Sequence, residues 1–252
     1  MELRTSDGIR ISGWLRRRDG SAPVCLIACH GYRGSSLQSL PWFQLAERLG
    51  CSCLAFDFRA HDHSGGGFTT CGAKEILDLA AAVDYVSSEP RRLGRIVVCG
   101  LSMGASTGIR LAAQDPRIKA VIAESPYLTL EHATHAWCRA TAGPFGPLLS
   151  EAMCRAAKAR WNVEPAEVSP MRAAAALVDT PLLVLAAGRD KLAPPESVRK
   201  IAEAAPLGQL VVLKRAMHAA CWATDGATVA TVAEAFIRRV TTPMQVAPKP
   251  DI

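Results

Sequence analysis

The chain has 252 residues, of which 49% are hydrophobic and 21% are charged, and its mean hydropathy is +0.13. This composition is typical of a globular protein with a large core, and no apolar run approaches the roughly 18 to 20 residues of a membrane span. The formal net charge of +6 is spread over dispersed arginines without a recognised nucleic-acid motif, so we expect no nucleic-acid partner. The first residues lack the apolar core of a signal peptide, and we therefore expect a cytoplasmic protein.

The nine cysteines are odd in number, and several of them lie inside apolar runs that resemble strands. We therefore interpret them as buried thiols that act as small hydrophobic residues, and not as a disulfide framework. Cys51 and Cys53 form a C-x-C pair, but no second pair follows at zinc spacing. We expect no metal site.

Short apolar runs alternate with segments of helical periodicity along most of the chain, which predicts an α/β protein. Eight strands are expected, at residues 2–5, 9–16, 24–29, 52–57, 96–99, 120–123, 182–186 and 210–213. Helices are expected at residues 37–49, 74–86, 105–113, 196–204 and 228–239. The first two strands predict an antiparallel hairpin, and the later apolar runs fit buried parallel strands. The proline-rich tail from Thr241 is predicted to be extended.

Residues 127–169 interrupt this alternation with a long stretch that has no strand pattern. Helical pieces are expected at 130–140 and 148–160, separated by the sequence GPFGP at 143–147. An insertion of this length between core strands is typical of a lid or a binding element. We therefore predict a single domain over residues 1–252 with a small helical cap at about 127–169.

The sequence CGLSMGAS, residues 99–106, places Ser102 between Gly100 and Gly104, directly after a predicted strand and before a predicted helix. The pattern G-x-S-x-G in this setting predicts a nucleophile elbow, a sharp turn that exposes a serine hydroxyl at the edge of the sheet. The N-terminus of the following helix favours negative charge near the serine. Ser102 is therefore the candidate nucleophile.

A serine hydroxyl needs a general base, and His218 is the one of the six histidines that follows the later predicted strands. Asp190, directly after the strand at 182–186, is the candidate acid that orients this histidine. Glu124, at the end of the strand at 120–123, is an alternative acid. These residues together predict a Ser-His-Asp triad.

An acyl-transfer site also needs donors for the oxyanion that forms on the substrate. The backbone N–H of Met103, next to the nucleophile, is one candidate. The second is the N–H of Tyr32 in CHGYRGS, residues 29–35, because this loop follows an early buried strand.

Together these motifs resemble a serine hydrolase of the α/β-hydrolase fold, from the group of esterases, serine aminopeptidase-like lipases and short-chain acyl hydrolases. HGYRGS resembles the oxyanion loop of that family, FDFRAHDHSGG its loop after the fourth strand, and TPLLVLAAGRDKLAPPE its acid strand and loop. The chain order Ser102, Asp190, His218 is also that of the family. The resemblance covers about residues 9–240, and it implies a mostly parallel eight-stranded sheet flanked by helices, with a variable cap.

One loop departs from the family pattern. The family commonly has R-G-H-G-x-S where Arg59 to Ser64 stand here, so that Ala60 and Asp62 replace glycines and leave the shape of the loop open. His61 and His63 in this loop superficially resemble metal ligands, but we expect a solvated or loop-stabilising role.

Three further polar residues attract attention. His30 is expected to shape the oxyanion loop, as the matching residue of the family does. Glu75 and Asp78 share a face of the helix predicted at 74–86 and are expected to make capping or surface contacts.

These observations predict a hydrolase that cleaves carboxylic esters of small or medium-sized substrates, with no cofactor and a small-molecule acyl substrate. Esters are favoured because their leaving group needs the least assistance. The same residues leave open a thioesterase, an amidase or peptidase, an acyltransferase, and a non-catalytic ligand-binding protein of the same fold. The sequence determines neither the acyl chain length nor the oligomeric state.

Overall fold

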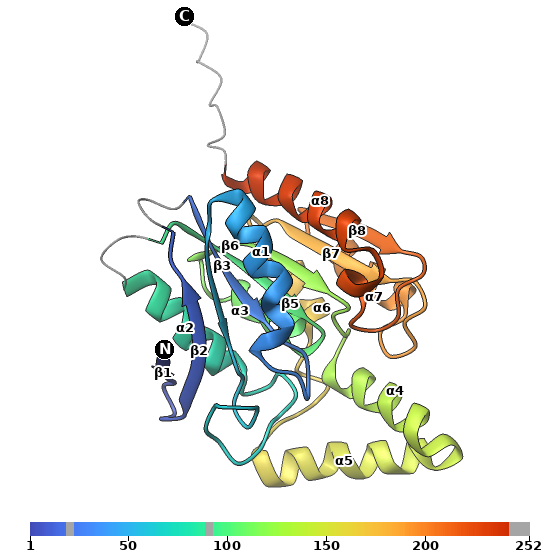
Figure 1. The fold of residues 1–252 in the computed structure, drawn as a ribbon. Coiled ribbons are helices and arrows are strands. Elements are labelled where there is room, and N and C mark those ends of the chain that lie inside the picture. The colour runs from blue at the N-terminus through green and yellow to red at the C-terminus, as the bar shows by residue number, and fades with distance from the viewer. Residues whose placement is uncertain (19–22, 89–92, 242–252) are drawn as a thin grey trace, which may run out of the picture.

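A computed structural model of the chain describes residues 1–18, 23–88 and 93–241 (Figure 1). Its centre is one sheet of eight strands. They are β1 (Glu2–Arg4), β2 (Arg10–Arg16), β3 (Val24–Cys29), β4 (Ser52–Phe56), β5 (Arg95–Leu101), β6 (Ile118–Glu124), β7 (Leu182–Ala187) and β8 (Gly208–Leu213). In the sheet they follow the order β1-β2-β4-β3-β5-β6-β7-β8. Strand β2 runs antiparallel to β1 and β4, and the other neighbouring pairs are parallel.

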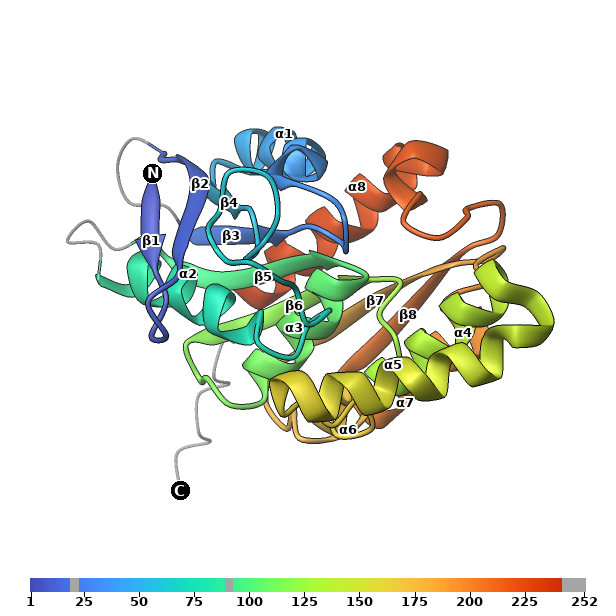
Figure 2. The same ribbon diagram turned by 90° about the horizontal axis from the view of Figure 1, so that it is seen from below.

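Helices cover both faces of this sheet. They are α1 (Leu40–Leu49), α2 (Ile76–Ser88), α3 (Met103–Ala112), α4 (Leu130–Ala142), α5 (Gly146–Trp161), α6 (Pro170–Ala175), α7 (Pro195–Ala204) and α8 (Cys221–Thr241), with short 3-10 helices η1 (Ser36–Ser39) and η2 (Gly143–Phe145). Helices α1 and α8 lie on one face, and α2, α3 and α7 lie on the other, as Figure 2 shows from a second direction. Within the described ranges, no helix is both long enough and apolar enough to cross a membrane.

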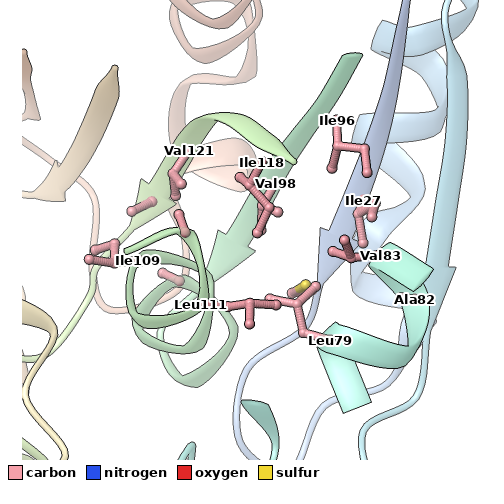
Figure 3. Packing of buried hydrophobic residues seen from close by; sticks show 14 of the residues in the cluster. Ile27, Leu79, Ala82, Val83, Ile96, Val98, Ile109, Leu111, Ile118 and Val121 are labelled. Carbon is pink, nitrogen blue, oxygen red and sulfur yellow. The ribbon is translucent and has the colours of Figure 1, made fainter. Parts of the chain in front are cut away.

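The core consists of two hydrophobic layers, one on each face of the sheet. Successive residues of a strand point to opposite faces, so Leu26 of β3 packs with Trp42 of α1 and Phe236 of α8. Its neighbour Ile27 packs on the other face with Leu79 of α2 and side chains of α3 (Figure 3). Because helices cover both faces, β3 is buried along its whole length, which explains its unbroken apolar sequence.

The secondary structure agrees with the sequence prediction in most elements. All eight predicted strands are present, and they form the mostly parallel sheet that was expected. Helix α3 begins at Met103, earlier than the predicted start at Ala105, and α6 was not predicted. The prediction of an extended tail concerns mainly residues 242–252, which lie outside the described residues.

The helix predicted at 228–239 is the second part of a longer one. Helix α8 already begins at Cys221, but Asp225 has non-helical backbone angles, φ −152° and ψ 64°, and breaks it. The carboxylate of Asp225 accepts a hydrogen bond from the N–H of Thr228 at 3.2 Å. This contact is a local N-cap, and it explains why the sequence signal for a helix starts at Thr228.

Helices α4 and α5, joined by η2, form a hairpin that lies apart from the sheet, at the bottom of Figure 1. Both helical pieces predicted within residues 127–169 are therefore present. The two helices pack mainly against each other. A small cluster that includes Leu130 and Val163 packs at the base of this α4–α5 hairpin, and Trp161 stacks on Phe68 with ring centroids 5.2 Å apart.

The nine cysteines are unpaired. Seven are buried, and Cys71 and Cys154 are half-buried. Burial raises the pKa of the thiols, for example that of Cys25 to about 12. They are neutral at physiological pH and pack as small hydrophobic side chains, as the sequence predicted.

Candidate active site

Ser102 lies in the tight turn between β5 and α3. Its backbone angles, φ 49° and ψ −106°, fall in a region that residues other than glycine rarely adopt. Its N–H donates to the carbonyl oxygen of Glu124 at 2.8 Å, which fixes the turn to β6. The turn also approaches β3 closely, because a Cβ at Gly104 would lie 2.5 Å from the carbonyl oxygen of Cys29. The strand, the strained turn and the helix have the arrangement that the sequence predicted.

His218 and Asp190 come from the loops after β8 and β7, and they meet Ser102 because these strands end at the same edge of the sheet. Nε2 of His218 lies 3.0 Å from Oγ of Ser102, and Nδ1 lies 2.7 Å from Oδ2 of Asp190. An ionised carboxylate only accepts hydrogen bonds, so Nδ1 carries the proton and Nε2 accepts from the serine hydroxyl. The structure thus brings together the three residues of the predicted triad.

The carboxylate of Asp190 is held on both oxygens. Its side chain is fully buried. While Oδ2 contacts His218, Oδ1 accepts the N–H groups of Leu192 at 2.9 Å and Ala193 at 2.8 Å. These backbone donors compensate the loss of water around the charge and fix the orientation of the carboxylate toward the histidine.

Glu124, the alternative acid, is bonded elsewhere. Its Oε1 accepts the N–H of Cys221, the first residue of α8, at 2.8 Å. The residue is buried, and burial raises the pKa of its carboxyl group above the usual range. Because its backbone carbonyl also accepts the N–H of Ser102, Glu124 connects the serine turn to the segment that follows His218. Of the two candidate acids, Asp190 is the one whose carboxylate contacts His218.

Tyr32 and Met103 line the same pocket as Ser102. Met103 is the first residue of α3, and its N–H has no acceptor within the helix. The loop after β3 is held by the N–H of Gly31, which donates to Oε1 of Gln38 at 3.1 Å. The N–H of Tyr32 takes part in none of the hydrogen bonds found among the described residues. Two N–H groups that have no acceptor in this part of the chain therefore border the pocket beside the serine.

His30 shapes this loop, as expected. Its Nε2 accepts the N–H of Phe58 at 2.9 Å, and its Nδ1 donates to the carbonyl oxygen of Gly31 at 2.7 Å. Burial lowers the pKa of His30 to about 4, so the ring is neutral at physiological pH. Protonation of Nε2 would break its hydrogen bond with the N–H of Phe58, which also favours the neutral ring and a lowered pKa.

The loop after β4, residues 57–75, keeps a glycine-like backbone at the positions that depart from the family. Ala60 and Asp62 have φ values of 57° and 37°, in the left-handed region that favours glycine. Between them, His61 uses both ring nitrogens within the protein: Nε2 accepts the N–H of Arg33 at 3.1 Å, and Nδ1 donates to the carbonyl of Arg59 at 2.8 Å. The role of His61 is therefore loop-stabilising. In the part of the chain that the structure describes, no three potential metal ligands converge.

Buried charges attach this loop to α2. Arg59 donates to Oδ1 of Asp78 from Nε at 2.9 Å and from Nη2 at 2.7 Å, and its Nη1 donates to Oδ2 of Asp7 at 2.7 Å. Burial raises the pKa of Asp78 to about 6 against the opposing effect of Arg59. Glu75, also fully buried, accepts four hydrogen bonds from residues 69–72. The expected surface contacts of Glu75 and Asp78 are therefore wrong, although Glu75 does hold the turn that precedes α2.

A pocket of about 290 Å³ opens at Ser102. The loop after β3 contributes Tyr32 and Arg33 to it, and the α4–α5 hairpin contributes Trp137 and Met153. The side chains that line it are mostly apolar. The pocket therefore offers a mostly apolar binding space that is bordered by the Ser102 hydroxyl and by two backbone N–H groups.

The sequence did not single out three residues of this site. Gln38 fixes the loop at Gly31, and Ser125, with φ 48° and a buried hydroxyl that has no partner among the described residues, lines the pocket. Cys221 contributes a backbone donor to Glu124. No local sequence signal marks these three residues, because their places at the site are set by the folded chain. The pocket residues of the α4–α5 hairpin did have a sequence signal, because the insertion at 127–169 predicted a lid or a binding element.

Comparison with known proteins agrees with the fold. The chain matches the alpha/beta hydrolase family over residues 26–233. The uncharacterized protein YqkD of Bacillus subtilis is 29% identical over 187 residues, which make up 72% of this chain and 60% of that protein. The uncharacterized protein Rv2307c of Mycobacterium tuberculosis is 28% identical over 220 residues, 86% of this chain and 70% of that protein. The match thus spans less than two thirds of the first of these relatives.

Among solved structures, the Pyrococcus furiosus esterase Pf2001 is similar with a TM-score of 0.79 and 28% identity, over 95% of this chain and 91% of that chain. The mostly parallel eight-stranded sheet and the family match define the class of the protein by its α/β-hydrolase fold. The chain belongs to the alpha/beta hydrolase family.

Proposed function

We propose that this hydrolase cleaves carboxylic esters through an acyl-enzyme on Ser102. The hydrogen-bond chain from Ser102 to His218 at 3.0 Å and on to Asp190 at 2.7 Å carries the proposal. A base in contact with a hydroxyl, itself oriented by a buried carboxylate, is the arrangement that activates serine as a nucleophile. The name of the similar Pyrococcus furiosus protein, an esterase, agrees with this choice of substrate class.

In the first half of the reaction, Oγ of Ser102 attacks the carbonyl carbon while its proton moves to Nε2 of His218. Asp190 accepts the Nδ1–H and stabilises the imidazolium. The carbonyl oxygen becomes an oxyanion that accepts hydrogen bonds from the N–H groups of Tyr32 and Met103. The intermediate then collapses, the bond to the alcohol oxygen breaks, and this oxygen takes the proton from His218 as the alcohol leaves.

In the second half, water attacks the acyl group with His218 as the base. The same two N–H groups donate to the new oxyanion, and its collapse releases the carboxylic acid while Ser102 regains its proton. These steps need no cofactor. Esters are favoured over amides because an alcohol oxygen depends less on proton transfer from His218 to leave than an amide nitrogen does.

The α4–α5 hairpin acts as a cap over the acyl site of a single domain. Trp137 and Met153 reach the pocket from this hairpin, while Ser102 and His218 reach it from the sheet. A mostly apolar space of about 290 Å³ fits a short or medium acyl chain better than a long one.

The test is hydrolysis of 4-nitrophenyl esters, from acetate to palmitate, by the native protein and by Ser102→Ala. We expect the native rate to peak at a short or medium chain and the variant to lose on the order of 10⁴-fold or more of it. A fluorophosphonate probe should label the native protein and not the variant.

The control is Ser87→Ala, which removes an exposed serine near the end of α2 and should leave both rate and labelling unchanged. A full rate in folded Ser102→Ala would show that another residue is the nucleophile. A native protein that hydrolyses none of the esters and resists the probe would leave thioesters or amides as substrates, or a ligand-binding role.

A further inference from the structure

The charges around the pocket at Ser102 are unevenly distributed. Of the described residues that line it, Arg33 alone carries a permanent charge, and His218 is the only other titratable base. The remaining lining residues are apolar or uncharged, such as Leu130 and Thr134 of α4. Arg33 is thus the one lining residue in the described part of the chain whose permanent charge could select the charge of a ligand.

The Arg33 side chain is exposed, and it forms no ion pair or hydrogen bond with any residue in the described ranges. Arg59, by contrast, is buried between two carboxylates of the protein. A guanidinium without a protein partner keeps all five of its N–H donors for solvent or for a ligand.

The backbone at Arg33 is fixed. Its φ of 59° is left-handed, and its N–H donates to Nε2 of the buried His61 at 3.1 Å. His61 in turn donates to the carbonyl of Arg59 at 2.8 Å, and its ring forms a T-shaped contact with the Tyr32 ring, with centroids 6.2 Å apart. Arg33 directly follows Tyr32, whose N–H is the proposed oxyanion donor. Its side chain therefore starts from a defined point next to the reacting carbonyl.

The carboxylates of Asp190 and Glu124 do not oppose an incoming anion. Asp190 is buried beneath His218 and is saturated by its hydrogen bonds to the histidine, Leu192 and Ala193. Glu124 is buried and bonded to the start of α8. An anion in the pocket therefore meets a positive group and no exposed negative one among the described lining residues.

We propose that the natural substrate of this site carries a carboxylate, which pairs with the guanidinium of Arg33 while the ester carbonyl lies at Ser102. The inference rests on the proposed esterase function and adds a substrate class to it. A guanidinium can donate two parallel hydrogen bonds to a carboxylate, which orients the ligand as well as attracting it. Because Arg33 is adjacent to the proposed oxyanion donor, the carboxylate lies a few bonds from the scissile carbonyl.

The test uses two pairs of substrates, and in each pair one member carries a free carboxylate and the other does not. On the acyl side, the 4-nitrophenyl ester of adipic acid with a free carboxylate is compared with the same ester capped as its methyl ester. On the alcohol side, 3-carboxy-4-nitrophenyl butyrate is compared with 4-nitrophenyl butyrate. The quantity measured is the ratio of kcat/KM for the charged over the neutral member, in the native protein, Arg33→Gln, Arg33→Lys and Arg199→Gln.

We expect one pair to favour its charged member in the native protein, and the pair that does so identifies the side of the ester that carries the carboxylate. In Arg33→Gln this ratio should fall about tenfold, mainly through KM, because the contact is made in the ground state as well as in the transition state. Arg33→Lys should recover part of the ratio, and high salt should lower it in the native protein. Arg199→Gln removes one exposed positive charge on α7, outside the pocket, and should leave the ratio unchanged.

Equal use of both members by the native protein, or an equal ratio in native protein and Arg33→Gln, would overturn the inference while esterase activity stands. A binding measurement, which does not depend on turnover, tests the inference even if the native protein hydrolyses none of these esters. In Ser102→Ala, calorimetry should show tighter binding of the charged ester than of the neutral one, and this difference should disappear when Arg33→Gln is added. Equal binding of the two esters overturns the inference whether or not the native protein hydrolyses esters.

Discussion

The loop after β4 and the α4–α5 hairpin both contribute to the pocket at Ser102, but different interactions hold them. The loop after β4 is attached by buried polar groups, with Arg59 bonded to Asp78 and Asp7, and with Glu75 accepting four hydrogen bonds. The hairpin packs mainly on itself and exposes large apolar side chains, including Phe145, which is 74% exposed.

Because of this difference, we expect the loop after β4 to fix backbone geometry at the site and the hairpin to influence which substrates fit. Directional hydrogen bonds allow few alternative geometries, so the loops at the edge of the sheet hold their backbone groups in fixed positions. Apolar contacts on the hairpin are less directional and tolerate exchange of side chains. We therefore expect changes at the sheet edge to alter stability, and changes on the hairpin to alter which substrates fit.

The largest effect is expected at the buried ion pair. Asp78→Ala leaves Arg59, whose side chain is 4% exposed, with only the half-exposed Asp7 as a charged partner among the described residues. Removing one member of a buried pair typically costs about 3–5 kcal/mol of unfolding free energy. Urea denaturation of the variant and the native protein measures this loss.

The matched control is Asp7→Ala, which removes the other carboxylate of Arg59. The side chain of Asp7 is 38% exposed, so we expect a loss of only about 1 kcal/mol. Equal losses for the two variants would contradict the view that burial makes the contact with Asp78 the stronger constraint.

A somewhat smaller effect is expected from pH, through His30. Its pKa is lowered from 6.5 to about 4 by burial, so the unfolded chain binds a proton in this range and the folded chain does not. The contribution of His30 to stability is fully present above pH 6.5 and is lost as the pH falls toward 4. The loss amounts to about 3 kcal/mol over this window.

Urea denaturation across that pH window, for the native protein and for His30→Gln, checks this prediction. The variant should be less stable near neutral pH, because it disturbs the contacts to Phe58 and Gly31. It should also lose less stability on acidification than the native protein does. Parallel curves for the two proteins would show that His30 does not titrate as expected.

The smallest effect is expected on the hairpin. Trp137, 39% exposed, lines the pocket, so Trp137→Ala enlarges it and should raise the rate for longer acyl chains over shorter ones roughly tenfold. Its effect on unfolding free energy should stay near about 1 kcal/mol. Phe145→Ala, at the tip of the hairpin and outside the pocket lining, should change neither quantity. The same shift in chain-length preference for both variants would mean that the hairpin does not define the pocket.

The predicted triad could be read from the sequence because each of its three residues stands shortly after a strand. The elbow sequence at Ser102 and the positions of Asp190 and His218 relative to their strands were sufficient, since parallel strands bring their carboxyl ends to one edge. The spatial order of the strands was not needed for that conclusion.

The contacts that could not be predicted depend on distant segments. Asp78 has the helical spacing of a surface residue, and the approach of Arg59 from a distant loop makes its burial possible. Ala60 and Asp62 adopt left-handed backbone angles that neither residue type signals, because the surrounding loop imposes them. Asp225 is a recognisable N-cap for the helix from Thr228, but the sequence before it gave no indication that the helix already begins at Cys221.

Glu124 determines how precisely the site can be assembled. Ser102 and His218 are separated by 116 positions in the chain, yet their side chains must meet at 3.0 Å. The carbonyl of Glu124 fixes the serine turn, and its carboxylate fixes Cys221, just after the histidine. Positional errors in the intervening helices and loops therefore do not accumulate between the two groups. The relative position of the serine turn and the segment after His218 therefore depends on one residue at the end of β6.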